Sequence, residues 1–105
     1  MWEERTYWIY IMASRRNGTI YTGMTNDLMR RVAEHKKREG NGFTATYGVT
    51  MLVYYERFGI PSDAISREKK LKRWHRKWKL SLIEARNPRW LDLCGDDGAI
   101  AAIWT

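Results

Sequence analysis

Residues 7–35 read YWIYIMASRRNGTIYTGMTNDLMRRVAEH, and this stretch decides the fold. Its segments 7–12 and 19–24 are rich in aromatic and β-branched residues, which favour strands. The residues between them, 13–18, end in an Asn-Gly pair, which is typical of a tight reversal because both residues adopt positive φ readily. The sequence therefore predicts a β-hairpin.

Alternate residues of a strand share a face. On residues 7–12 the even-numbered side chains are therefore expected on one face and the odd-numbered ones on the other. On the second strand Tyr21 and Gly23 share a face. Tyr10 and Tyr21 can then lie side by side, if the register of the hairpin allows it.

A helix is predicted to begin at Leu28, because residues 25–27 are Thr-Asn-Asp, which can cap its first turn. The basic and then glycine-punctuated residues 36–42 predict its end near Arg38 or Glu39. Positions 28, 31, 32 and 35 fall on one stripe of such a helix. Arg31 and His35 therefore share the apolar stripe with leucine and valine. A buried arginine is unfavourable unless it meets an anion or a hydrogen-bonding partner.

This segment resembles the GIY-YIG nuclease family. Residues 8–10 (WIY) stand in place of the first triplet, residues 21–23 (YTG) stand in place of the second, and Arg31 and His35 match the family's helical arginine and a histidine of many members. The first triplet carries tryptophan instead of glycine, and the second carries threonine instead of isoleucine. Neither departure removes a reacting group.

Composition and charge bound the possible partners. The chain of 105 residues has room for one domain, taken as residues 1–93 with a tail at 94–105. Its net charge of +7 suits a polyanion such as nucleic acid, and DNA is the expected partner. The other interpretation of the charge is a soluble surface with surplus lysine.

The single cysteine, Cys94, excludes an internal disulfide and fits a reducing compartment. The sequence shows no signal peptide and no apolar run of membrane-spanning length, so the cytoplasm is the expected location. The tail could be a frayed end, a short docked helix or a contact between two copies of the chain.

A third strand is predicted at residues 49–58, after a loop that includes residues 43–48. The resemblance implies an α+β fold in which a small three-stranded antiparallel sheet is flanked by three or so α-helices. Tyr47 either reaches the site or packs on the loop. Gly23 and Asn87 are further candidates for supporting roles, and Asn87 also stops the last helix because Pro88 follows it.

The second helix is predicted from Asp63 towards Trp74, with Pro61 fixing its entry and Ser62 capping it. Glu68 falls within its inward stripe, and a lone buried carboxylate is unfavourable. Pairing with Arg31 or with a cation would remove the conflict. The expected inward stripe consists of Ala64, Ile65, Glu68, Leu71 and His75.

Residues 75–85 are predicted to continue as a basic amphipathic helix with Trp78 and Leu82 facing inward. The basic run at 67–76 is either a solvated face or a surface that follows phosphates. Its neighbouring tryptophans Trp74, Trp78 and Trp90 could stack on bases, although helical spacing favours core packing. The nucleic-acid-binding residues expected from the sequence are Arg30, Lys36, Arg67 and Lys70.

The resemblance implies a metal-dependent endonuclease that hydrolyses phosphodiester bonds in DNA. A preference for certain DNA structures and a link to DNA repair or recombination are further expectations. Glu68 would hold one Mg²⁺ or Mn²⁺, and Arg31 would neutralise the phosphate. Tyr10 or Tyr21 would orient and deprotonate a water, with His35 taking the proton or supporting a tyrosine. Two other functions fit the same residues: a non-catalytic nucleic-acid-binding module, and a protein-interaction domain with an inert Glu68–Arg31 pair. Specificity would come from the basic faces, a partner protein or a homodimer.

Overall fold

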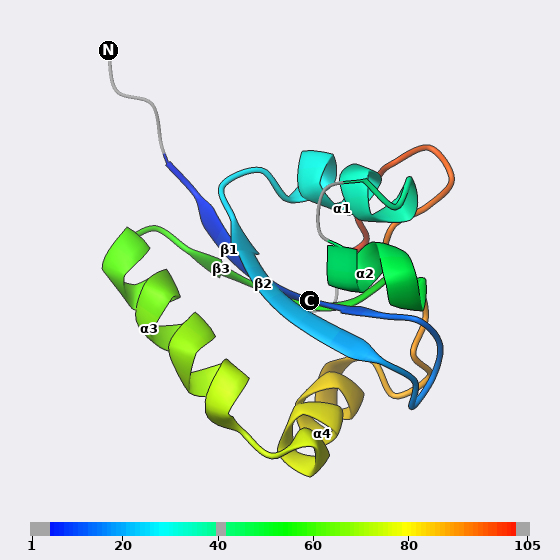
Figure 1. Ribbon diagram of the computed structural model, residues 1–105. Helices are drawn as coiled ribbons and strands as arrows, with labels where there is room; N and C mark the ends of the chain where they lie inside the picture. The colour runs from blue at the N-terminus through cyan, green and yellow to red at the C-terminus, as the bar shows by residue number, and fades with distance from the viewer. Residues whose placement is uncertain (1–4, 40–41, 103–105) are drawn as a thin grey trace.

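The computed structural model describes residues 5–39 and 42–102, and these ranges contain three strands and four helices. In chain order they are β1 (Tyr7–Ala13), β2 (Ile20–Thr25), α1 (Leu28–Lys36), α2 (Gly42–Tyr47), β3 (Met51–Phe58), α3 (Pro61–Arg73) and α4 (Arg76–Arg86). The strands form one antiparallel sheet in the order β2-β1-β3, so β1 is central (Figure 1). The predicted α+β class and three-stranded sheet are confirmed, with four helices instead of about three.

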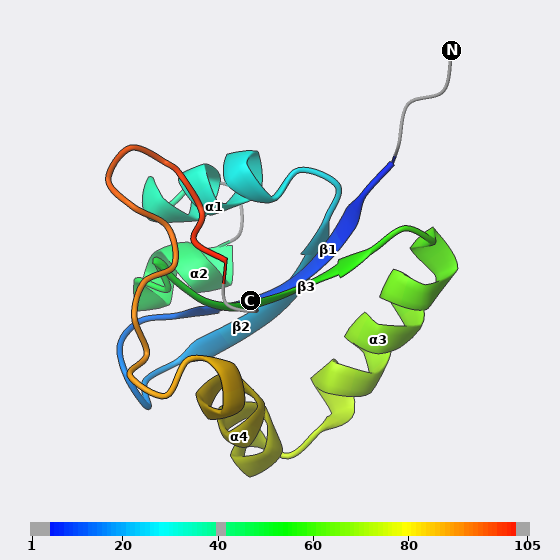
Figure 2. The same ribbon diagram turned by 180° about the vertical axis from the view of Figure 1, so that it is seen from behind.

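The two faces of the sheet are covered by different helices. Tyr10 and Met12 point to the face on which Leu28 and Val32 of α1 pack. On the opposite face, Ile9 packs against α3. Ile11 packs against α4 on that same face. Figure 2 shows α3 and α4 from behind, separated from α1 and α2 by the sheet.

The hairpin turn uses only one positive φ. Asn17 has φ 56°, whereas Gly18 is not in the left-handed region. Gly18 is needed for space instead, because a Cβ at this position would lie 2.4 Å from Oγ of Ser14. The backbone of Ser14 and Thr19 closes the turn with a hydrogen bond of 2.9 Å.

Helix α1 begins as predicted and ends earlier. The side chain of Asp27 caps it by accepting a hydrogen bond of 3.2 Å from the backbone of Arg30. The last helical residue is Lys36, since Arg38 adopts a left-handed φ of 57°. A non-glycine residue in that conformation gives no strong sequence signal.

The prediction of a loop before β3 is wrong in part, because residues 42–47 form helix α2. Gly48 follows it with φ 63°, and β3 begins at Met51, two residues later than expected. Six residues with a threonine-rich composition have weak helix propensity, and tertiary contacts decide such a short helix.

Two details of the C-terminal helices also differ from the prediction. Ser62 does not cap α3, because the helix already begins at Pro61 and Ile60 occupies the N-cap position without a side-chain hydrogen bond. The expected continuous helix is interrupted at Trp74, whose ψ of 145° is extended, and α4 starts at Arg76. The break contains neither glycine nor proline, which are the usual signals of interruption.

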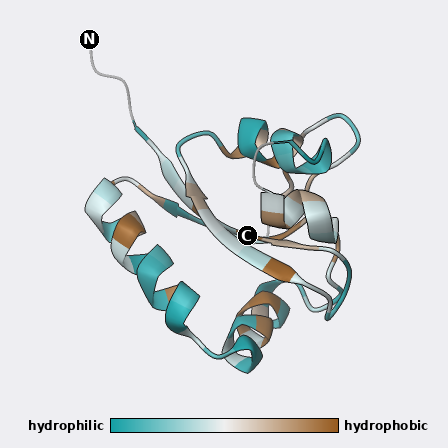
Figure 3. Ribbon diagram, in the orientation of Figure 1, coloured by the Kyte–Doolittle hydropathy of each residue, from teal (hydrophilic) through white to brown (hydrophobic). Residues whose placement is uncertain are grey.

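Several side chains of α3 and α4 differ from their predicted exposure. Ile65, His75 and Trp78 are exposed, whereas Ala64 and Leu71 are buried as predicted. The outer side of α3 is mostly hydrophilic in Figure 3.

Residues 94–102 fold back onto the sheet. The backbone of Ala101 donates to the carbonyl of Leu93 at 2.7 Å, and the hydroxyl of Tyr55 donates to the carbonyl of Ala101 at 2.7 Å. Ile100 packs against the core on the α1 face. The last residues, 103–105, lie outside the described ranges. Within those ranges no helix is long and apolar enough to cross a membrane.

Candidate active site

A pocket of about 440 Å³ lies at the end of the edge strand β2. Its charged residues are Arg31, from α1, and Glu68, from α3. These helices pack on opposite faces of the sheet, so the two side chains meet around its edge. The remaining lining residues are Tyr7, Met24, Thr25 and Asn26.

Tyr10 and Gly23 are direct partners across β1 and β2. The ring of Tyr10 lies over this glycine, where a Cβ would be 2.5 Å from the tyrosine hydroxyl. Any larger residue at this position would displace the tyrosine. Gly23 is therefore a geometric requirement for the placement of Tyr10.

His35 holds the buried hydroxyl of Tyr10. Its Nε2 lies 2.9 Å from the tyrosine hydroxyl, and its Nδ1 lies 3.1 Å from Oγ1 of Thr44 in α2. Burial, with a contribution from the charge of Arg31, lowers the pKa of His35. A neutral imidazole fits this pair of contacts, because it donates through one nitrogen and accepts through the other.

The Tyr10 phenol is far from being a ready base. Burial raises its pKa well above the usual value, and the neighbouring Tyr21 adds to this effect. The charge of Arg31 and its hydrogen bonding act in the opposite direction, and Glu68 raises the pKa slightly further. Arg31 and Glu68 are thus close enough to influence the Tyr10 hydroxyl electrostatically.

Tyr21 lies beside both members of this pair. Its ring centroid is 6.3 Å from that of Tyr10 and 5.5 Å from that of His35. The side-by-side placement of the two tyrosines, which the sequence left dependent on register, is therefore present. Tyr21 is only half-buried, so it stands between the buried pair and the surface.

Arg31 and Glu68 do not form a direct ion pair in the part of the chain that is described. Nε of Arg31 lies 3.2 Å from Oε1 of Glu34, and the two side chains form an ion pair. This buried Nε has no hydrogen-bond partner among the described residues. Glu68 instead lies 3.7 Å from Nζ of Lys72. The arginine fork therefore keeps hydrogen-bonding capacity for another anion.

Glu68 has the surroundings of a carboxylate that could hold a hard cation. Its side chain is 23% exposed and lines the pocket beside Thr25 and Asn26, whose side chains carry oxygen atoms. Among the described residues no three His, Cys, Asp or Glu side chains come together as a metal-binding group. A single carboxylate suits Mg²⁺ or Mn²⁺, because such ions are commonly completed by water and substrate phosphates.

Of the nucleic-acid-binding residues predicted from the sequence, Lys36 and Arg67 are engaged in partly buried ion pairs. Lys36 contacts Asp92 and the carbonyl of Thr50, and Arg67 donates two hydrogen bonds to Glu56 at 2.9 and 2.8 Å. By contrast, Arg30 and Lys70 are exposed, and Arg30 makes a solvent-facing ion pair of 3.8 Å with Asp27.

Asn87 and Trp90 have structural contacts. The side chain of Asn87 is buried and donates to the carbonyls of Val53 and Leu91 at 3.0 and 2.9 Å, which fastens the end of α4 to β3. Trp90 is buried in the core on the α4 face. Trp78, in contrast, is exposed.

Helix α2 contributes residues that the sequence did not reveal. Thr44 is fully buried against His35, and Phe43 lies with its ring centroid 6.3 Å from that of Tyr21. The ring centroid of Tyr47 lies 4.9 Å from that of Phe43, so among the described residues Tyr47 is linked to the site through that ring. A glycine-punctuated segment that contains aromatic and hydroxyl residues just before a strand was the available signal.

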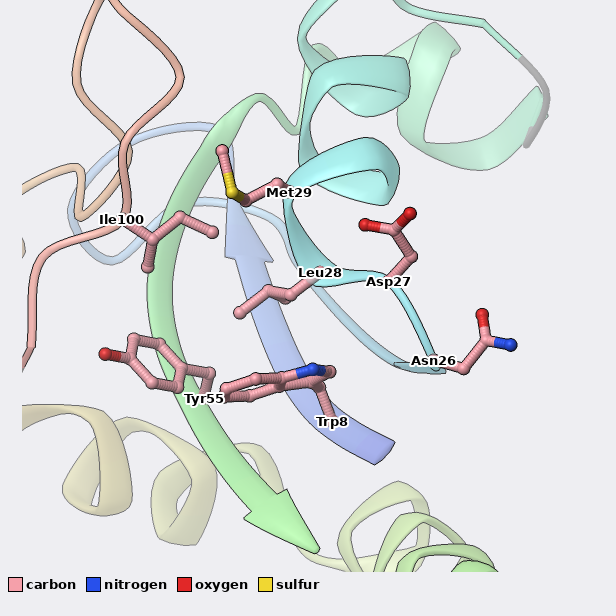
Figure 4. A pocket seen from close by; sticks show the side chains of 7 residues that line it. All are labelled: Trp8, Asn26, Asp27, Leu28, Met29, Tyr55 and Ile100. Carbon is pink, nitrogen blue, oxygen red and sulfur yellow. The ribbon is translucent and has the colours of Figure 1, made fainter. Parts of the chain in front are cut away.

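Trp8, which replaces the glycine of the first triplet, belongs to a separate apolar pocket of about 370 Å³ (Figure 4). Its indole makes an edge-to-face contact with Tyr55 at 5.7 Å. In Figure 4 this pocket opens between α1 and the C-terminal segment carrying Ile100. The substitution therefore fills space under α1.

Comparison with known proteins agrees with this arrangement. The sequence model of the GIY-YIG catalytic domain family matches residues 6–81, which include every residue that lines the pocket with Arg31 and Glu68. The chain belongs to the GIY-YIG family. This membership makes it a protein of a nuclease-type family and confirms the resemblance drawn from residues 8–10 and 21–23.

Small GIY-YIG relatives match most of the chain. A UPF0213 protein of Staphylococcus haemolyticus is 36% identical over 80 residues, covering 76% of this chain and 96% of the relative. One of Staphylococcus saprophyticus is 35% identical over 77 residues, covering 73% and 93%. The solution NMR structure of a UPF0213 protein of Bacillus halodurans superposes with a TM-score of 0.53 at 26% identity, covering 83% and 92%. These names specify no activity.

Proposed function

We propose that this chain is a divalent-metal-dependent endonuclease that hydrolyses phosphodiester bonds in DNA. The observation that carries the proposal is that Arg31 and Glu68, from opposite faces of the sheet, line one pocket. The charges of both side chains act on the pKa of the Tyr10 hydroxyl. A cation and a phosphate between these two side chains would satisfy both charges.

Each residue then has a chemical task. Arg31 offers a planar, permanently charged fork to the phosphate oxygens. Glu68 would hold a Mg²⁺ or Mn²⁺ ion with one carboxylate. Such an ion would supply positive charge to the phosphate. Tyr21, at the half-buried side of the pair, orients the attacking water.

Proton removal proceeds through Tyr10 and His35 together. Because the pKa of Tyr10 is raised, a free phenolate is unfavourable. The hydroxyl instead accepts the proton of the water while it passes its own proton to Nε2 of His35, which lies 2.9 Å away. Bound phosphate offsets the charge of Arg31, which is one cause of the lowered pKa of His35, and so strengthens this acceptor.

A cleavage screen tests the proposal. Single-stranded, flapped, branched and duplex DNA are incubated with Mg²⁺ or Mn²⁺ and with EDTA, using wild type and Glu68→Ala. The control is Asp63→Ala, an exposed acidic residue of the same helix. We expect metal-dependent cutting by wild type and by the control only. Robust cutting by Glu68→Ala would exclude Glu68 as the metal ligand.

Stability separates the metal-binding role from a purely structural one. Glu68 pairs only with Lys72, whose side chain is about half exposed, among the described residues. Glu68→Gln should therefore change the free energy of unfolding by less than about 1 kcal/mol. A loss of several kcal/mol would support the inert structural role instead.

The same screen addresses the non-catalytic alternative. A binding module would show no cleavage, equal DNA binding by wild type and Glu68→Ala, and an affinity that falls steeply with salt. Preference for flapped or branched DNA would support the proposed link to repair or recombination. The free thiol of the buried Cys94 fits the proposed cytoplasmic location.

A further inference from the structure

Two large aromatic side chains stand exposed beside the proposed active site. Phe43 is 46% exposed and Tyr47 is 56% exposed, and both lie on the short helix α2. Their ring centroids are 4.9 Å apart at an interplanar angle of 47°. The two rings thus present a continuous exposed aromatic surface, and exposed apolar patches often mark binding sites.

These rings continue the site outward. Phe43 contacts Tyr21, and Tyr21 contacts Tyr10 and His35. Thr44, between the two exposed rings in sequence, is buried against His35 and fixes the helix to the site. A ligand that lies on Phe43 and Tyr47 would therefore be next to the group that deprotonates water.

The charge around the helix identifies the kind of ligand. The guanidinium of Arg38 lies against Gly48, where a Cβ would be 2.8 Å from Nη2, and this glycine directly follows Tyr47. A cation next to exposed aromatic rings suits a nucleotide, which carries a flat base and an anionic phosphate. The net charge of +7 points to the same partner.

We propose that Phe43 and Tyr47 form a stacking platform for an unpaired base of the DNA substrate, adjacent to the phosphate that is cut. This inference rests on the proposed function and specifies its substrate: the strand must be unpaired on the side of α2. Paired bases are already stacked on their neighbours and cannot lie on the rings. The platform therefore selects single-stranded or flapped DNA over continuous duplex.

Binding without metal tests the platform apart from catalysis. In EDTA, a fluorescently labelled oligothymidylate is titrated with wild type, Phe43→Leu, Tyr47→Ala and Tyr47→Phe. Trp78→Ala is the matched control, because this aromatic residue of α4 is equally exposed, at 55%. Base stacking is worth about 1–3 kcal/mol per base, so Phe43→Leu and Tyr47→Ala should each weaken binding about tenfold. Tyr47→Phe and Trp78→Ala should bind as wild type.

An oligonucleotide of the same length with abasic sites keeps the phosphates and removes the bases. Wild type should bind it about tenfold more weakly, and Tyr47→Ala should cause no further loss. Equal loss by Tyr47→Ala on both oligonucleotides, or no loss on either, would overturn the platform. Wild-type affinity that is the same for duplex and single strand would also overturn it.

The two proposals can fail separately. Cleavage that requires Glu68 but is insensitive to Phe43→Leu and Tyr47→Ala would leave the nuclease and remove the platform. Base-dependent binding with no cleavage by wild type would leave the platform on a non-catalytic module. Circular dichroism tests whether Phe43→Leu is folded, and the exposed Tyr47 provides a second variant whose truncation should leave the core intact.

Discussion

The ring of Tyr10 lies so close over Gly23 that a single methyl group on that glycine would be 2.5 Å from the tyrosine hydroxyl. The two residues are partners across β1 and β2, so the register of the hairpin and the position of the hydroxyl are fixed together. The glycine of the second triplet thus serves a side chain of the first.

Gly23→Ala should therefore displace Tyr10 and break its hydrogen bond to His35. Overpacking at a buried position typically destabilises by about 1–3 kcal/mol. Urea unfolding measures this change, and the cleavage assay should show a parallel loss. Gly59→Ala is the control, because a Cβ there meets nothing within 4 Å. Wild-type stability and activity of Gly23→Ala would contradict the observed packing.

Arg31→Ala should remove the phosphate contact while the chain stays folded, because the side chain is 39% exposed and its one ion pair among the described residues is with Glu34. Loss of one preorganised charge at a reacting phosphate lowers kcat by roughly 10²–10³-fold. Arg30→Ala changes the neighbouring exposed arginine and should alter only salt-dependent binding. Single-turnover kinetics of both variants compare them directly, and similar losses would show that general charge matters more than position.

Stability should fall on acidification because of His35. Burial and Arg31 lower its pKa in the folded chain, so the unfolded chain binds a proton at higher pH than the folded chain does. The free energy of unfolding contributed by this group is then fully present above the unfolded pKa of about 6.5 and decreases as the pH falls below it. Urea unfolding between pH 5 and 8 should show a smaller dependence for His35→Gln, and the same slope in both proteins would contradict this assignment.

Ile100→Ala should destabilise the domain, since this side chain of the C-terminal segment packs on the core beside Trp8. Truncating a partly buried isoleucine should lower the free energy of unfolding by about 1–2 kcal/mol. Ile60→Ala, at an exposed position, provides the control. No difference between the two variants in thermal or urea unfolding would mean that residues 94–102 are dispensable for the fold.

The sequence was sufficient for the hairpin, the sheet and the two charged residues of the pocket because each has a local signal. Aromatic and β-branched residues around an Asn-Gly pair mark β1 and β2, an Asx cap marks α1, and two triplets at a fixed spacing mark the family. The inward position of Glu68 follows from helical periodicity once the start of α3 is known.

The remaining features depend on tertiary contacts. Helix α2 is only six residues long and is held by the contact between Thr44 and His35, which no local pattern encodes. The helix breaks at Trp74, where the sequence has neither glycine nor proline to signal it, and Trp78 beyond the break is exposed. Lys36 and Arg67 are basic and were assigned to DNA, but their carboxylate partners Asp92 and Glu56 are distant in sequence.

The pocket at the edge of β2 takes its arginine from one side of the sheet and its carboxylate from the other. Neither residues 7–35 nor α3 alone holds both charges, and the chain reaches α3 only after completing β3. The candidate site is therefore a property of the finished tertiary structure. Under the proposed function, a partly folded chain in which α3 has not yet packed on the sheet would lack half of the site, so DNA cleavage would depend on completed folding.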